Sequence, residues 1–137
     1  MAPRAEATKK SAASKTSRLG YMTLIAGWLI PGAGHLLLKR WGRGVLVLAS
    51  ITCMFVLGIM MGAKLYAPNT ADLLDMLGFL GDLGAGLLYM IGHGLGLGQA
   101  PVQVVTADYG AKFVVVAGLL NLISAVDAHN IAVGRKL

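Results

Sequence analysis

The sequence has few charged residues and almost no cysteine. Only 13% of its 137 residues are charged, about half the share usual in soluble proteins, whereas 56% are hydrophobic. A soluble core of this size could not hide so much apolar surface, so lipid must surround much of the chain. The single cysteine, Cys53, excludes an intrachain disulfide and a multi-cysteine metal site. We therefore expect one small all-helical integral membrane protein, without a second large domain.

The sequence also lacks the motifs that identify common enzyme classes. It contains no His-Glu-x-x-His zinc motif and no nucleophile elbow. The glycine-rich run 92–98 has neither the Gly-Lys-Ser nor the flanking strand of a phosphate loop. An enzyme needs an acid–base or nucleophile pair within reach, and no such pair is evident. We expect a non-enzymatic protein.

Basic residues outnumber acidic residues and flank the apolar runs. Twelve Lys and Arg against six Asp and Glu give a net charge of +6. Beside apolar runs, such residues are typical of topology signals and of contacts with anionic lipid headgroups. We expect membrane lipids as partners, including anionic headgroups, and no nucleic acid. Residues 1–18 are basic and have no apolar run to bury, which predicts a disordered cytoplasmic tail.

An uncharged apolar stretch at 19–38 organises the rest of the chain. Its length could just cross a bilayer, but its middle holds Pro31, Gly32 and Gly34, which break helices. We predict a helical hairpin over 19–43, either re-entrant or a short span, that returns to its own side. A re-entrant backbone must be covered by protein or water, so the spanning helices have to shield the turn.

Charge distinguishes this hairpin from a full span. If residues 19–38 crossed the membrane, the basic cluster Lys39–Arg43 would lie outside, against the positive-inside rule. With the hairpin, ten of the twelve Lys and Arg are cytoplasmic, and only Lys64 and Lys112 lie outside. We therefore expect a protein of the inner (cytoplasmic) membrane with both termini in the cytoplasm. A four-span bundle and a secretory signal cleaved before His35 are the alternatives.

Two spanning helices and an irregular apolar segment are predicted after the hairpin. Gly58 and Gly62 form a GxxxG pair in the first span, which permits close helix packing. Asp72 is a candidate helix cap, and we expect the helix after it to break near 92–98 or to form a third span. The single membrane domain 19–137 then consists of the hairpin 19–43, a span at 44–66, a Gly-rich outer segment at 72–98, a linker at 99–108, a span at 109–128 and a tail at 129–137.

Two stretches resemble a known group of proteins. Pro31–Gly44 (PGAGHLLLKRWGRG) resembles the loop of small bacterial membrane proteins related to the two-transmembrane (TM-two) domain group. In that group a Gly-x-Gly-His turn precedes an aromatic-Leu-Gly step, whereas here Leu37 replaces the aromatic residue and Lys39 replaces the glycine. Ser124–Ala128 resembles the Asp-Ala ending of the group's last helix. The resemblance implies a membrane protein in which the Pro31–His35 turn is important, and it implies no activity.

Ionisable residues from the turn and from the last span fall on the same expected side. Asp127 ends the last span, and in the hairpin topology it can approach His35, Arg43 or the basic residues between them. An ionisable group near a bilayer is costly and usually finds a partner. We predict a structural pair or helix-end clamp, with a proton relay as the alternative. Trp28 and Trp41, which flank the turn, are expected to be interface anchors.

His93 is the one residue for which we consider a cofactor. Imidazole ligates haem iron and the magnesium of (bacterio)chlorophyll, and the flanking Gly92 and Gly94 leave room for a flat macrocycle. The competing interpretation is a histidine at a helix end that is hydrogen-bonded to the backbone. We therefore expect that the protein binds no cofactor, and the alternative is a haem or chlorophyll ligated by His93.

Together these features predict an accessory or scaffold subunit of a larger membrane complex. Its many small residues would pack against other membrane protein subunits. A haem- or chlorophyll-binding subunit that uses His93 is one alternative. The other is an oligomeric channel or transporter component, in which Asn121, Ser124 and Asp127 recur at a three-residue step and line a polar path.

Overall fold

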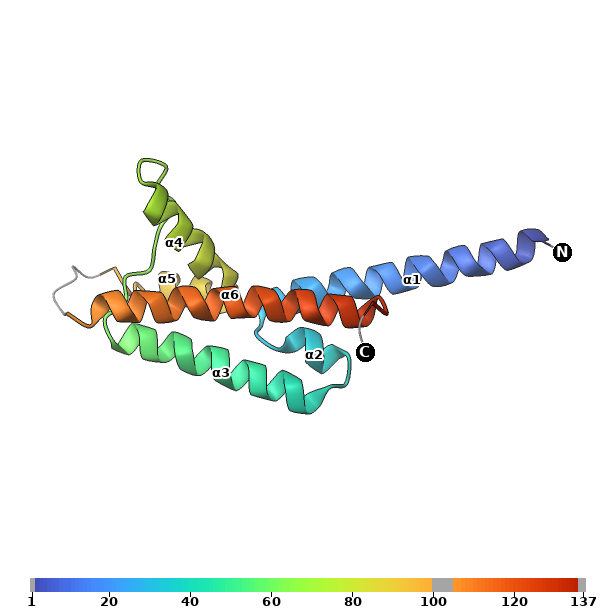
Figure 1. Ribbon diagram of the computed structural model, residues 1–137, viewed down its shortest axis with the longest axis horizontal. Helices are drawn as coiled ribbons and strands as arrows, with labels where there is room; N and C mark the ends of the chain where they lie inside the picture. Colours follow the sequence, from blue (N-terminus) through green and yellow to red (C-terminus); the bar gives the residue numbers. More distant parts are fainter. Residues whose placement is uncertain (1, 100–104, 136–137) are drawn as a thin grey trace.

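The computed structural model describes residues 2–99 and 105–135, and within these ranges it consists of helices, turns and loops without a strand (Figure 1). The prediction of an all-helical protein is confirmed. Part of the predicted linker, 100–104, and the end of the predicted tail, 136–137, lie outside the described residues. The helices are α1 (Ala2–Leu29), α2 (Ala33–Leu37), α3 (Trp41–Met60), α4 (Leu73–Gly84), α5 (Leu87–Gly94) and α6 (Ala107–Ala132).

Of these helices, α3 and α6 are long and apolar enough to cross a membrane. α4 and α5 pass the same test only as a pair, and they are bent by 113° relative to each other, as in a broken span or a re-entrant loop. The described residues thus contain two candidate membrane spans, or three if the bent pair counts as one. α3 begins before the predicted span 44–66 but already ends at Met60, whereas α6 extends beyond the predicted span 109–128 at both ends.

α6 is the helix against which most of the others pack. It contacts α1, α2, α3 and α4. Glycines form the closest crossings: a Cβ added to Gly110 would lie 2.6 Å from the carbonyl oxygen of Gly58 in α3. A Cβ added to Gly84 of α4 would lie 2.6 Å from the carbonyl oxygen of Gly118. Residues without bulky side chains let helix backbones approach closely, which is how helices associate in lipid.

α1 and α2 form a hairpin beside the C-terminal half of α6. Gly20 of α1 faces His129, and Gly27 faces Ala125, so α1 runs antiparallel to α6 and ends near its middle. The chain turns where the sequence predicts, through Gly32 with a φ of 78°, and α2 then leads back toward the end from which α1 came (Figure 1).

α4 and α5 form a second hairpin, which approaches from the opposite end. Gly81 of α4 faces Val115 and Gly84 faces Leu122, so α4 reaches the middle of α6 from its N-terminal side. The turn follows at Gly86, which has a φ of 61°. The two hairpins therefore meet beside the middle of α6.

The helix ends within the predicted range 92–98, because α5 stops at Gly94, and Gly96 and Gly98 have positive φ, but an additional turn that was not predicted lies at Gly86. Glycine is required at position 86 because the φ is positive and because a Cβ there would run into the carbonyl oxygen of Trp28. Gly92 instead lies inside α5, where a Cβ would meet Leu65 and Phe55 at 3.2 Å. The sequence offers many glycines in this region, and only tertiary contacts decide which one forms the turn.

Residues 2–18 differ from the predicted disordered tail, because they continue α1 as an exposed helical extension (Figure 1). Alanine, lysine and arginine, which are abundant here, are strong helix formers. A helix that is already nucleated by packing elongates at little cost. The packed part of α1 therefore supplies the nucleus for the extension.

The predicted GxxxG pair separates into two roles. Gly58 packs against α6, but Gly62 lies beyond the end of α3 and has a φ of 83°. A Cβ added to Gly62 would meet only Ala107, at 3.9 Å. A glycine in the left-handed conformation just after a helix is a common terminator. We correct the packing role predicted for Gly62 to helix termination.

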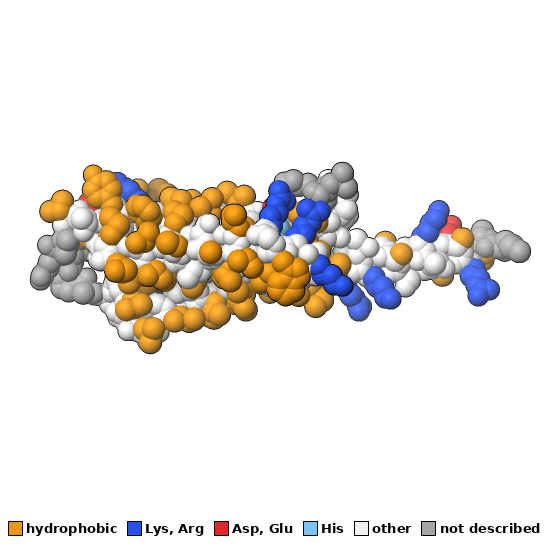
Figure 2. All heavy atoms as spheres, turned by 90° about the horizontal axis from the view of Figure 1, so that it is seen from below, with side chains coloured by type: hydrophobic (Ala, Val, Ile, Leu, Met, Phe, Trp, Pro, Cys, Tyr) orange, Lys and Arg blue, Asp and Glu red, His pale blue; other side chains and the backbone are white. Residues whose placement is uncertain are grey.

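The outer surface has the character expected next to lipid. Figure 2 shows hydrophobic side chains over the body of the molecule, and Lys and Arg side chains along the extension and at the adjoining end. Large residues such as Leu46, Ile123 and Met90 are more than half exposed. The apolar core is small and is built around Ile51, Phe55 and Val114 with several alanines.

Candidate functional site

The side chain of Asn121 lies where the two hairpins meet and is completely buried. Its Nδ2 donates to the carbonyl oxygen of Trp28 at 2.7 Å and to that of Gly84 at 2.9 Å. Trp28 belongs to the last turn of α1, and Gly84 is the last residue of α4. One amide group therefore caps the C-terminal ends of two helices.

Trp28 provides a third cap at the same junction. Its Nε1 donates to the carbonyl oxygen of Leu83 at 3.1 Å, so a side chain of α1 satisfies the end of α4. The indole N–H of Trp28, predicted to be an interface anchor, therefore has its partner inside the protein. Trp41, by contrast, is 66% exposed at the start of α3, where an anchor would lie.

These caps satisfy the carbonyl groups of helices that end inside the bundle. The last carbonyl groups of a helix have no partner within the helix. An unsatisfied polar group away from water costs several kcal/mol. Asn121 supplies the donor for two such carbonyl groups, and Trp28 adds a second donor to the Leu83 carbonyl, which also accepts the backbone N–H of Gly86 at 3.0 Å.

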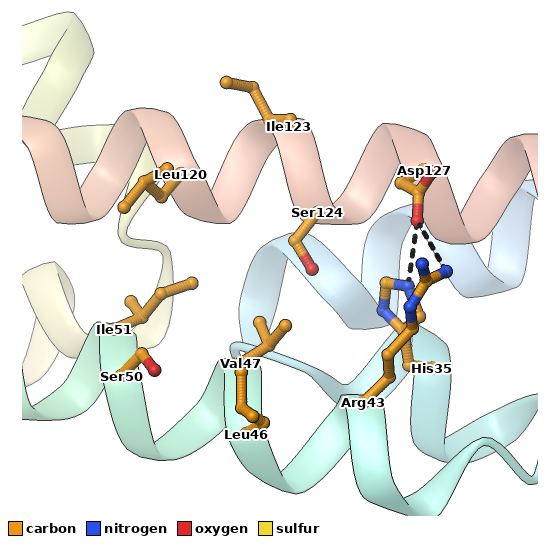
Figure 3. Close-up of a pocket in the computed structure, with 10 residues that line it drawn as sticks. All are labelled: His35, Arg43, Leu46, Val47, Ser50, Ile51, Leu120, Ile123, Ser124 and Asp127. Carbon is orange, nitrogen blue, oxygen red and sulfur yellow. Dashed lines mark hydrogen bonds and ion pairs between the residues drawn. The ribbon is translucent and has the colours of Figure 1, made fainter.

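A cluster of ionisable side chains joins α2, α3 and the C-terminal part of α6. His35 Nε2 lies 3.2 Å from Asp127 Oδ2, and Arg43 Nη1 lies 3.6 Å from the same oxygen (Figure 3). The His35 side chain is 3% exposed, whereas that of Arg43 is 53% exposed. A carboxylate only accepts hydrogen bonds, so this contact requires the proton of His35 on Nε2. The structure thus brings together three residues that the sequence predicts to pair.

The turn residues place His35 in this cluster. Gly34 lies between α1 and α6, where a Cβ would be 2.7 Å from the Ala128 side chain and 2.8 Å from the Thr23 carbonyl oxygen. Pro31 is buried at the turn itself. Lys39 ends the α2 segment with a φ of 58°, the left-handed region that favours glycine.

A groove of about 470 Å³ extends from this cluster between α3 and α6 (Figure 3). His35, Arg43 and Asp127 line one end of the groove. Its walls are mostly aliphatic, with two hydroxyl groups from Ser50 and Ser124. The groove is therefore amphipathic along its length, with charge at one end and apolar walls beyond it.

A second polar group, not foreseen from the sequence, holds the loop after α3. Asp82 of α4 is completely buried, and its Oδ2 accepts the backbone N–H of Tyr66 at 2.8 Å. The hydroxyl of Tyr89 in α5 donates to the carbonyl oxygen of Tyr66 at 2.8 Å. Burial, with smaller effects of the Asp75, Asp82 and Asp108 carboxyls, raises the pKa of the Tyr66 phenol. Both backbone groups of one loop residue are thus fixed by the second hairpin.

His93 is exposed near the end of α5 and stacks on Tyr89, with ring centroids 5.7 Å apart. Nothing lies within 4 Å of a Cβ added to Gly94 or Gly96, so the surface beside the imidazole is open. Among the described residues, no group of three or more His, Cys, Asp and Glu side chains could hold a metal ion.

The predicted polar stripe on α6 divides between two environments. Asn121 points into the junction of the hairpins, whereas Ser124 and Asp127 line the groove. The capping role of Asn121 and the burial of Asp82 were not predicted from the sequence. The available signal was a polar side chain within an apolar segment, because such a group must find a partner.

Comparison with known proteins places the chain in a family without an assigned role. A protein-family model described as a family of unknown function, DUF6677, matches residues 22–137. No curated protein and no solved structure matches the chain significantly. The resemblance to the two-transmembrane group is tested by none of these comparisons and stays a prediction.

We predict that Asn121→Leu destabilises the protein by about 2–4 kcal/mol, because two buried carbonyl groups lose their donor. Unfolding in mixed micelles, followed by circular dichroism, measures the change. Asn130→Leu is the matched control, since Asn130 also lies in α6 but near its C-terminal end. Equal stability of the two variants would contradict the capping role.

We also predict that Asp127 is coupled more strongly to His35 than to Arg43. The His35 side chain is buried and that of Arg43 is half exposed, and exposed ion pairs contribute little. A double-mutant cycle with alanine at His35 and Asp127 should give a coupling energy above about 1 kcal/mol. The corresponding cycle at Arg43 and Asp127 should give a coupling energy below about 1 kcal/mol. A coupling energy near zero for His35 and Asp127 would show that they do not form a structural pair.

Proposed function

The chain belongs to DUF6677, a family of unknown function, and we propose that it is a non-enzymatic accessory or scaffold subunit of a larger membrane complex. The observation that carries the proposal is the use of its interior polar groups. Asn121, Trp28 and Asp82 are engaged in capping helices or fixing a loop, and His35 is engaged with Asp127. These contacts stabilise the fold, and at the end of the groove the His35 imidazole is engaged with the Asp127 carboxylate.

The outer surface supports a role in assembly. Exposed large aliphatic side chains surround the bundle, whereas the small residues are largely used in its internal crossings. A rigid body held together by Gly–Gly crossings and polar caps is suited to position neighbouring subunits in a bilayer. The exposed basic extension of α1 adds a segment that can lie along anionic headgroups or a partner at the membrane surface.

We place both termini in the cytoplasm, with the α1–α2 hairpin re-entrant from that side. The end of the bundle that carries the N-terminus, the Lys39–Arg43 cluster and the C-terminus is the basic end (Figures 1 and 2). Lys64 and Lys112 lie toward the opposite end, with Asp72 and Asp108. The positive-inside rule favours this orientation in the inner membrane.

A haem- or chlorophyll-binding role at His93 remains the second proposal. The open surface beside the imidazole, next to Gly94 and Gly96, is the observation that favours it. A channel or transporter role is the third, but Asn121 lies inside the junction and does not continue the line of Ser124 and Asp127. An oligomer would have to supply the rest of a polar path.

The proposed orientation predicts which loops an impermeant maleimide reaches from outside the cell. In a Cys53→Ser background, Thr70→Cys should be labelled and Gly42→Cys should not, since Thr70 lies in the α3–α4 loop and Gly42 beside the basic cluster. Both positions are exposed, so access to the membrane side decides the result. Labelling of Gly42→Cys from outside would favour the four-span bundle.

The proposed role predicts that the chain leaves its native membrane in mild detergent as part of a hetero-complex. Native mass spectrometry should give a mass well above the 14.2 kDa of the chain and include other subunits. A mock purification from cells with an untagged chain is the control. A pure homo-oligomer would contradict the accessory role in favour of a channel. A Soret-type absorption band that is lost in His93→Ala would instead support the pigment-binding role.

A further inference from the structure

The groove between α3 and α6 has the form of a site for an amphiphile. It is bounded at one end by Arg43, Asp127 and His35, and its walls are formed by aliphatic side chains such as Val47, Leu120 and others (Figure 3). From Asp127 to Leu120 the α6 wall measures roughly 10 Å, at 1.5 Å per helical residue. The groove lies along two candidate membrane spans, where acyl chains are the neighbouring molecules.

The charged end of the groove favours an anion. Arg43 Nη1 lies 3.6 Å from Asp127 Oδ2, and its half-exposed guanidinium carries five N–H donors, more than this one contact uses. A planar guanidinium binds phosphate oxygens in pairs. Arg43 also lies in the first turn of α3, which contains no acidic residue and whose N-terminal N–H groups carry a partial positive charge. Two further exposed cations, Lys39 and Arg40, lie four and three residues before it in the chain.

We infer that this groove binds one anionic phospholipid of the surrounding leaflet, with an acyl chain along the apolar walls and the phosphate at Arg43. Lipid tails are as apolar as the groove, so the chain contributes shape and little selectivity. The headgroup contributes the selectivity, because Arg43 and the neighbouring cations outnumber the single carboxylate of Asp127. The site goes beyond a scaffold role, and it does not depend on that role.

The structure also explains why the groove is not simply filled by protein. Ser50 and Ser124 stand on facing helices where larger side chains would close the space. Near the opposite end of α3, the crossing of Gly58 and Gly110 brings the two helices together. α3 and α6 are thus in closest contact at one end and leave space between them toward the cluster.

Native mass spectrometry of the full-length protein tests the inference, with phosphatidylglycerol and phosphatidylcholine of identical acyl chains as probes. We expect the anionic lipid to be retained about tenfold more strongly, as a charge-assisted phosphate contact would give. This comparison uses the unaltered protein and does not depend on the folding of a variant. Equal retention of the two lipids would overturn the inference.

Variants locate the site within the protein. Arg43→Gln should remove most of the preference for the anionic lipid, whereas Lys64→Gln, which removes one charge at the opposite end, should leave it unchanged. Ser124→Phe should fill the groove and reduce retention about tenfold, whereas Cys53→Phe, on an exposed position of α3 outside the groove, should not. Equal effects within either pair would show that the lipid binds elsewhere.

Discussion

The fold depends on finding hydrogen-bond donors for helix ends that lie inside the bundle. α1 and α4 both stop beside the middle of α6, where water cannot satisfy their last carbonyl groups. The amide of Asn121 donates to one carbonyl of each helix, and Trp28 donates to a further one. Without these donors, each hairpin would leave unsatisfied backbone in an apolar interior. The position of one asparagine on α6 thereby fixes where both hairpins turn.

Three polar groups at different levels then hold the remaining elements to this axis. The Asn121 junction lies at the middle of α6, and the Asp127 cluster ties α2 and α3 to its C-terminal part. Asp82 and Tyr89 fix the loop after α3 toward the N-terminal part. Between these polar groups the helices meet through glycine and alanine, which let their backbones approach closely. The hydrogen bonds and ion pairs of the polar groups then set how the helices are aligned along one another.

Features that depend on local composition could be predicted from the sequence. Long uncharged runs predicted the two long apolar helices that are candidate spans, and Pro31 and Gly32 predicted the first turn. Asp72 caps α4 by accepting the N–H of Leu74 at 2.9 Å, as expected. The approach of Asp127 to His35 followed from the topology. These features can be predicted because helix-breaking, helix-capping and charged residues act on the chain within a few residues of their own position.

Features that depend on contacts between distant segments could not be predicted. The second turn requires glycine at position 86, because a Cβ there would meet the carbonyl of Trp28, which lies 58 residues away in the chain. The roles of Asn121 and Asp82 depend on partners that the sequence does not reveal. The helical extension of α1 was missed because composition alone cannot tell whether a packed segment nucleates the residues before it.

The two halves of the molecule resemble an inverted repeat. Each half of the chain consists of a hairpin followed by a long helix, and the halves run in opposite directions, because α3 and α6 are antiparallel. Both turns also contain Gly-Ala-Gly, at 32–34 and 84–86. Inverted repeats of this kind look similar from the two faces of a bilayer. The apolar body alone therefore discriminates weakly between two directions of insertion, and the basic residues of the α1 extension and of Lys39–Arg43 are what make those directions unequal.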